Sequence, residues 1–264
     1  MNALNFTYDG VSSEDMGIIM CSYDGDSEIT TVGSKVEFST AKSPNSSYKW
    51  LKTNATYTEQ LTFTFSLGKN PCTTNDEEMY FSSEEQAAVI RWLVRKEYHY
   101  LCFYDTDSFE NIYYNCFMTL EKKQIAGKTI GFTATVTCDA PFGWSEERTA
   151  TVTTDINKVF DTSQEIGYII PNTVVTALYD GDVRIYNDNT NETTVIKNCK
   201  ANEQITLTDM MRISSSIEHK NLYDDFGDWV FPKIQNSYNN NVNTFELTNC
   251  KLNIKWREIR KAVI

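Results

Sequence analysis

The side chains best suited to acid–base chemistry are scarce in this chain, which contains only two histidines, His99 and His219. His99 lies between two tyrosines on a predicted strand, where we expect a structural role. His219 lies in a polar segment with no serine or cysteine motif beside it, and the chain has no Gly-x-Ser-x-Gly elbow. We therefore predict that the protein is not an enzyme. A hydrolase built on His219 and loop carboxylates is the weakest alternative. Chain order alone does not exclude it, because a catalytic triad is defined by geometry.

Metal-ligating residue types are present but badly spaced. The acidic run from Asp105 to Glu110 resembles the start of a calcium loop, yet Glu110 stands where such a loop needs glycine and Cys116 where it needs an acid. The seven cysteines form no Cys-x-x-Cys pair, so neither a zinc site nor a disulfide framework is indicated. We predict reduced thiols, several of them buried, and neither a metal nor a cofactor.

One segment combines carboxylates with aromatic rings. Asp224 and Asp225 stand among Tyr223, Phe226 and Trp229. Carboxylates beside exposed aromatic rings suit contact with a protein or a sugar, so Tyr223, Asp224, Asp225 and Trp229 are candidate contacts with a partner or a sugar. The favoured alternative is that Trp229, with Phe231 and Ile234, belongs to the core of an alternating strand.

The elements that would position these residues are mainly β-strands. Residues 57–67 alternate between apolar and polar side chains, which is typical of a strand with one buried face. A helix is predicted near 83–97, because Ser82 or Ser83 followed three residues later by Glu85 or Gln86 forms a capping box. Short alternating segments fill residues 149–264 without helical periodicity, which predicts an all-β sandwich or barrel.

Residues 139–148 include Pro141 and Gly143, which interrupt strand patterns. We place a domain boundary there, with an N-terminal domain over 1–141 and a C-terminal domain over 142–264.

The polar stretch 39–54 lies between two predicted strands and contains Pro44, Tyr48 and Trp50. A two-stranded arm at this position would expose its strand edges unless another subunit covered them. An inter-subunit hairpin and an ordinary surface loop are both compatible with this pattern.

Charge narrows the possible partners. The chain carries 24 basic and 36 acidic side chains, a formal net charge of −12, which argues against direct nucleic-acid binding. The absence of an 18-residue apolar run predicts no membrane insertion, and the opening residues lack the pattern of a signal peptide, so we expect synthesis in the cytoplasm. The C-terminal cations are either a solvated chain end or a basic patch for an acidic partner: Lys251, Lys255, Arg257, Arg260 and Lys261, against Glu258.

Several motifs, in order, resemble the distal tail protein family of long-tailed bacteriophages. They are the aromatic strand and turn at 6–18, the capped helix near 85, the Ala-Pro-Phe-Gly-Trp segment at 140–144, Gly181–Thr190, Trp229–Pro232, Asn243–Phe245 and Leu252–Arg257. The resemblance implies a mainly β fold: an N-terminal β-sandwich with one helix and an extended hairpin, and a galectin-like C-terminal β-sandwich. It implies a homohexameric ring at the virion tail tip, in which the hairpin belts the neighbouring subunit.

The implied partners are the tail tube protein, the tail hub or tail-associated protein, and receptor-binding proteins, and the protein would be made in the host cytoplasm. The second hypothesis is a carbohydrate-binding adhesin that uses the segment around Tyr223 and Trp229. The chain lacks the added carbohydrate-binding insertion of larger family members, which weakens that hypothesis. A hexamer without sugar binding favours the first hypothesis, and a monomer that binds glycans favours the second.

Overall fold

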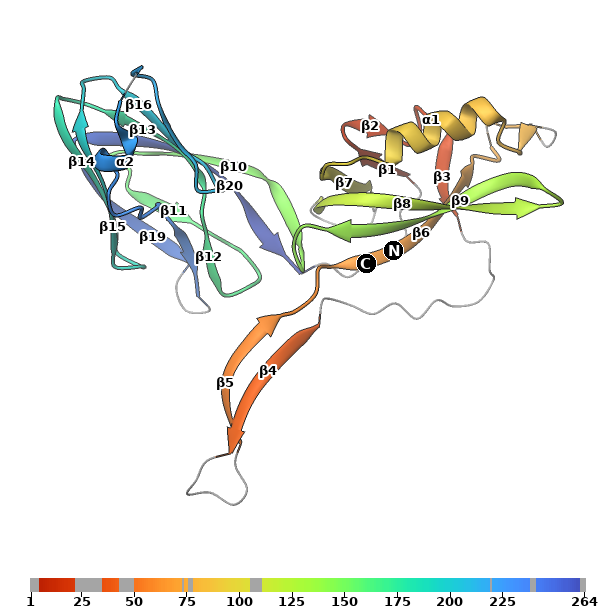
Figure 1. Ribbon diagram of the computed structural model, residues 1–264, viewed down its shortest axis with the longest axis horizontal. Helices are drawn as coiled ribbons and strands as arrows, with labels where there is room; N and C mark the ends of the chain where they lie inside the picture. The colour runs from red at the N-terminus through yellow and green to blue at the C-terminus, as the bar shows by residue number, and fades with distance from the viewer. Residues whose placement is uncertain are drawn as a thin grey trace. The chain divides into compact units, whose positions relative to one another are not determined.

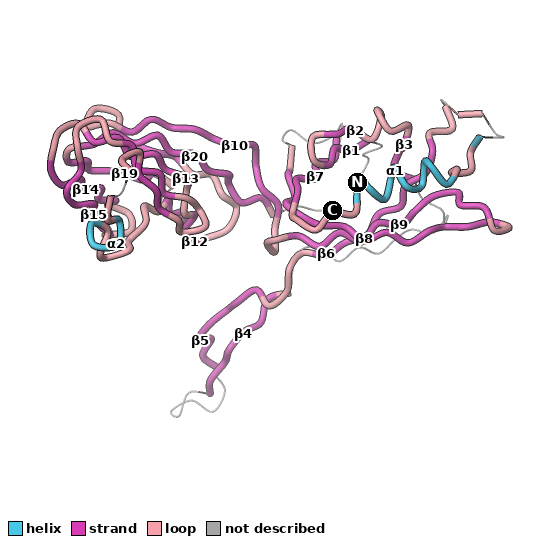
Figure 2. Tube along the Cα trace, turned by 45° about the horizontal axis from the view of Figure 1, so that its top comes forward, coloured by secondary structure: helices cyan, strands magenta, loops and turns pink. Residues whose placement is uncertain are grey.

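The computed structural model describes residues 5–21, 35–42, 50–72, 74–75, 78–104, 111–218, 220–237 and 241–261; for residues 41–42 and 50–54 it describes the backbone alone. The chain forms two compact units, one of residues 1–145 with 261–264 and the other of residues 146–260. Each unit has its own hydrophobic core. Figures 1 and 2 show both units as layered strands with little helix.

The first unit is an antiparallel β-sandwich whose strands are hydrogen-bonded in the order β2-β1-β7-β8-β9-β6-β3. The bounds are β1 (Asn5–Tyr8), β2 (Val11–Ser12), β3 (Ile18–Cys21), β6 (Thr62–Lys69), β7 (His99–Tyr104), β8 (Tyr113–Ile125) and β9 (Lys128–Cys138). The predicted alternation is confirmed in β6, where Phe63, Phe65 and Leu67 are buried, Thr62 and Thr64 are exposed, and Ser66 is half-buried.

Aromatic rings fill much of this core. The Phe6 ring stacks on Trp92 of helix α1 with centroids 5.5 Å apart, and meets Phe65 edge to face at 5.3 Å. The Trp92 indole also donates a hydrogen bond to the Tyr8 carbonyl at 3.0 Å. The helix is therefore fixed to the first strand by both packing and hydrogen bonding.

Helix α1 (Ser83–Leu93) begins where the capping box predicts, and Ser82 is the cap. Its hydroxyl accepts from the Glu85 N–H at 3.2 Å, and the Glu85 carboxylate accepts from the Ser82 N–H at 2.7 Å. The predicted end near residue 97 is wrong, because Val94 already has extended backbone angles. The cations at 95–96 follow the helix and do not form its last turn.

Strands β4 (Val36–Lys42) and β5 (Trp50–Tyr57) pair only with each other in the described part of the chain and form a separate two-stranded sheet. The predicted extended hairpin is thus confirmed as an element. Pro44 and Tyr48 lie outside the described residues, and Trp50 is described by its backbone, as the first residue of β5.

The second unit is a β-sandwich. One sheet has the order β17-β16-β13-β20-β10, and the other, four-stranded, has the order β11-β19-β14-β15; β12 pairs with β18. The bounds are β10 (Gly143–Val152), β11 (Lys158–Phe160), β12 (Gly167–Ile169), β13 (Asn172–Ala177), β14 (Gly181–Asn187), β15 (Glu192–Cys199), β16 (Gln204–Leu207), β17 (Ile213–Ser215), β18 (Ile234–Asn236), β19 (Val242–Thr248) and β20 (Cys250–Arg260).

The predicted mainly β fold is confirmed, with two corrections. The second unit is not wholly β, because Leu222–Asp225 forms the single-turn helix α2. The proposed boundary region also contains β10, a strand that begins at Gly143 directly after Pro141 and Phe142. The galectin-like character of the second unit stays a prediction.

Candidate assembly surfaces

The predicted contact segment forms one turn of helix and the loop after it. Tyr223 and Trp229 are 74% and 46% exposed, and their rings meet edge to face with centroids 6.2 Å apart. Phe226, buried beneath them, contacts Trp229 at 5.6 Å. Trp229 has a φ of 50°, an uncommon backbone conformation for a bulky side chain. The structure therefore brings the two predicted aromatic residues together on the surface.

The two aspartates of this segment have different surroundings. The Asp225 carboxylate accepts a hydrogen bond from Asn198 Nδ2 at 2.7 Å and lies 4.0 Å from Lys220 Nζ. Asp224 is exposed and accepts a hydrogen bond from Asn221. Asp225 thus has a structural task, while Asp224 stays available for a partner. The alternative of a strand core is correct for Ile234, which is buried in β18, and wrong for Trp229, while Phe231 is a buried core residue outside any strand.

A buried ion pair fixes the start of the segment. Lys220 Nζ lies 2.9 Å from Glu203 Oε1, and both side chains are almost completely buried. Burial alone would raise the pKa of Glu203, but hydrogen bonds from Ser215, the Lys200 N–H and Lys220 outweigh it and hold the pKa below its usual value. No local pattern indicates this pair, because its members are 17 residues apart in the chain.

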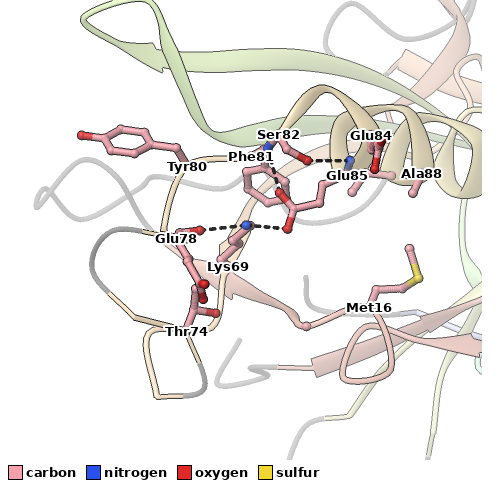
Figure 3. A pocket seen from close by; sticks show the side chains of 12 residues that line it. Met16, Lys69, Thr74, Glu78, Tyr80, Phe81, Ser82, Glu84, Glu85 and Ala88 are labelled. Atoms are coloured by element: carbon pink, nitrogen blue, oxygen red, sulfur yellow. Dashed lines mark hydrogen bonds and ion pairs between the residues drawn. The ribbon is translucent and has the colours of Figure 1, made fainter.

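A hollow of about 660 Å³ lies at the N-terminal end of α1 (Figure 3). Lys69 points into it and donates to Glu85 Oε1 at 2.6 Å and to the Glu78 carbonyl at 2.8 Å. Met16 and Phe81 give it apolar walls. Since Glu85 is already engaged by Lys69 and by the helix cap, this hollow holds a structural ion pair and not an acid–base pair poised for catalysis.

The structure gives His99 a structural environment. Its Nδ1 lies 2.9 Å from Asp9 Oδ1, and its ring meets Tyr8 edge to face. Burial raises the pKa of both Cys138 and Cys250 to about 12, which keeps these thiols protonated at neutral pH. His219 and the acidic run 105–110 lie outside the described residues.

The described part of the chain offers neither a metal-binding cluster nor a membrane-spanning helix. It contains no group of three or more His, Cys, Asp or Glu side chains placed to hold a metal ion. Its helices are also too short or too polar to cross a membrane.

The C-terminal cations do not form one patch. Lys251 and Lys255 lie on the exposed face of β20, where Lys255 Nζ is 3.4 Å from Glu147. Arg260 is buried instead, with its Nη2 2.8 Å from Glu258 Oε2. The prediction that Arg260 and Glu258 belong to a solvated chain end is therefore wrong.

Comparison with known proteins identifies the family. Residues 1–140 match the family model described as a phage tail protein N-terminal domain, and residues 142–256 match the one described as a phage tail C-terminal domain. No curated protein is significantly similar in sequence.

Solved structures show the same fold over nearly the whole chain. The crystal structure of the SPP1 Dit protein superposes on this chain with a TM-score of 0.63 at 14% identity, and the match covers 97% of this chain and 99% of that one. That protein is described as a paradigm of the hub adsorption apparatus in phages that infect Gram-positive bacteria. Chains of the phage p2 baseplate in its activated conformation give TM-scores of 0.50 with Sr (11% identity, 96% and 97% covered) and 0.51 with Ca (12%, 95% and 97%). The resemblance noted in the sequence is confirmed at the level of family and fold. The chain belongs to the family of phage tail proteins defined by these two domains.

Proposed function

We propose that the protein is a distal tail hub, which forms a homohexameric ring at the end of the phage tail and joins the tail tube to the tip or baseplate. Its family and its Dit fold support this role. The observation that carries the ring is the β4–β5 hairpin, which forms a separate two-stranded sheet and whose described side chains are mostly exposed.

The described side chains of the hairpin are exposed, apart from the half-buried Val36, and Phe38 is 58% exposed. An isolated two-stranded hairpin is at best marginally stable in water, and its strand edges can pair with another chain. A neighbouring subunit that covers the hairpin would stabilise it and would also protect its strand edges from pairing with other chains. Pro44 and Tyr48, which stand between the two strands in the sequence, and Trp50, the first residue of β5, remain the candidate contacts with that neighbour.

A ring role is also consistent with the acidic charge and with a sequence that carries no recognised catalytic motif. A cyclic hexamer uses two different faces of each subunit, and a channel lined by subunits of net charge −12 would not retain DNA. The partners would be the tail tube protein, the tail hub protein and receptor-binding proteins. The protein would be made in the host cytoplasm and act in the virion tail without enzymatic activity.

The test is the mass of the protein in solution, by light scattering on a sizing column, with negative-stain imaging of the peak. Six copies of the 30.3 kDa chain give a ring of about 182 kDa. A variant in which residues 37–56 are replaced by a short Gly-Ser turn should stay monomeric while its circular dichroism and thermal unfolding show both sandwiches folded. If the wild-type chain forms no six-fold ring either in solution or on isolated tails, the proposal is wrong.

The exposed Tyr223–Trp229 pair supports a second candidate, a glycan-binding adhesin. An adhesin would bind a glycan array as a monomer, and Trp229→Ala would abolish that binding. Asp209→Asn, at an exposed turn of the same unit, is the control that should leave it unchanged. A hexamer that gives no array signal would exclude this candidate.

A further inference from the structure

The β8–β9 hairpin ends in an ordered tip that its own unit leaves uncovered. Residues 121–128 are all exposed, although strand pairing continues from Glu121↔Thr133 to Ile125↔Lys128, with one register shift between Lys123 and Gln124. The turn is tight, since Ala126 and Gly127 have φ values of 50° and 79°, as the two-residue turn of a hairpin requires. Ile125, at its start, is 59% exposed.

The tip is basic within an acidic protein. Lys122, Lys123 and Lys128 outnumber the single acid Glu121, while the whole chain has a net charge of −12. We call Lys122, Lys123, Ile125 and Lys128 the basic tip. An apolar side chain that shares a hairpin tip with three lysines suits a surface that offers carboxylates around a small apolar contact.

Contacts within the first unit hold the basic tip in place. Lys122 Nζ donates to Gln86 Oε1 on α1 at 2.7 Å, and Lys128 Nζ lies 4.6 Å from the centre of the Tyr80 ring. Figures 1 and 2 show β8 and β9 running alongside α1. A tip fixed in this way loses little conformational entropy on binding, which favours its use as an interface.

We propose that the basic tip binds an acidic surface on a second copy of this chain. Copies with a net charge of −12 repel one another, so a ring needs contacts at which the sign of the charge is locally reversed. The basic tip supplies that reversal on the first unit. This inference rests on the proposed ring and assigns one of its contact surfaces.

The test compares two double variants with the same change in net charge. Lys122→Glu with Lys123→Glu reverses the basic tip, and Lys158→Glu with Lys197→Glu reverses two exposed lysines of the second unit. Rings of each variant and of the wild type are diluted, and the concentration of half-assembly is measured by mass photometry. Reversal of the tip should raise this concentration about tenfold or more relative to the control variant.

A third variant, Ile125→Thr, removes the exposed apolar contact but keeps a β-branched residue in the strand, so it should weaken assembly without changing the charge. Thermal unfolding checks that each variant is folded. Rings of the tip variants that dissociate at the same concentration as the control would overturn this inference and leave the hub proposal intact. A wild-type chain that never forms rings would overturn the hub proposal, and the tip contact with it.

Discussion

At the scale of single residues, the least expected feature is a group of buried charges where β20 meets the loop after β11. Glu258 is fully buried and accepts hydrogen bonds from the Thr162 N–H at 2.8 Å and from the Thr162 hydroxyl at 2.7 Å. Arg260 and Arg148 pair with the same carboxylate, with Arg148 Nε at 2.9 Å. Glu258 is therefore well compensated, as a buried charge must be.

Asp161 lies close to this group, but its buried carboxyl has fewer hydrogen bonds to stabilise a negative charge than Glu258 has. Asp161 is 0% exposed; one oxygen accepts from the Ser163 hydroxyl at 2.9 Å, and Oδ2 has no hydrogen-bond partner among the described residues. Burial raises its pKa, and the negative charge of Glu258 raises it further, against hydrogen bonding by Ser163 and attraction by Arg260. A carboxyl with a raised folded-state pKa costs nothing when it is protonated in both states and destabilises the fold as the pH rises above its unfolded pKa.

Asp161→Asn removes that cost while its amide oxygen can still accept from Ser163. The melting temperature of the variant relative to wild type should therefore increase from pH 4 to pH 7. Thermal unfolding across this range measures it, with Asp155→Asn, at an exposed position, as the control. A difference that is the same at both pH values would show that Asp161 does not titrate abnormally.

At the scale of elements, sequence reasoning worked where the local pattern carries the physical cause. The alternation in β6 and the capping box of α1 were readable because the responsible residues are neighbours in sequence. The strands β11, β17 and β18 span only three residues each, too few for a periodic pattern to define their bounds. The surface position of Trp229 could not be predicted either, because it depends on the turn at α2 and on Lys220, which bonds to the distant Glu203.

The helix cap gives a prediction at this scale. Ser82→Ala removes the hydroxyl that accepts from the Glu85 N–H and should destabilise the first unit by about 1 kcal/mol. Ser83→Ala is a matched control, since Ser83 is exposed within the first turn and alanine favours the helix. Denaturant unfolding followed by circular dichroism distinguishes the two. Equal losses in both variants would mean that the box contributes nothing to stability.

At the scale of the whole molecule, the two separate hydrophobic cores are the dominant fact. The sequence predicted the number of domains from one interruption near 140, whereas no local pattern could identify which side chains close each core. A chain with two cores need not unfold in a single step, so each unit can be probed by a variant of its own.

We expect calorimetry to resolve two unfolding transitions. Ser82→Ala should lower the transition temperature of the first unit only. Lys220→Met should destabilise the second unit only, by about 3 kcal/mol in its free energy of unfolding, because it leaves Glu203 buried without its cation. Since the pKa of Glu203 is lowered in the fold, its stabilising contribution is present at neutral pH and lost in acid, so the Lys220→Met deficit should shrink as the pH falls. A single transition shifted by both variants would contradict independent units.

The exposed faces of the β4–β5 hairpin also bear on how long an unassembled subunit survives. Proteases cleave extended backbone that can leave its strand pairing, and a two-stranded hairpin whose described side chains are mostly exposed has little packing to oppose this opening. If the subunit assembles into the proposed ring, an unassembled copy would present a cleavable segment, and an assembled copy would hide it beneath its neighbour. Proteolysis would then remove surplus or misfolded subunits and spare assembled ones, so the hairpin would set the turnover of the protein as well as its place in the ring.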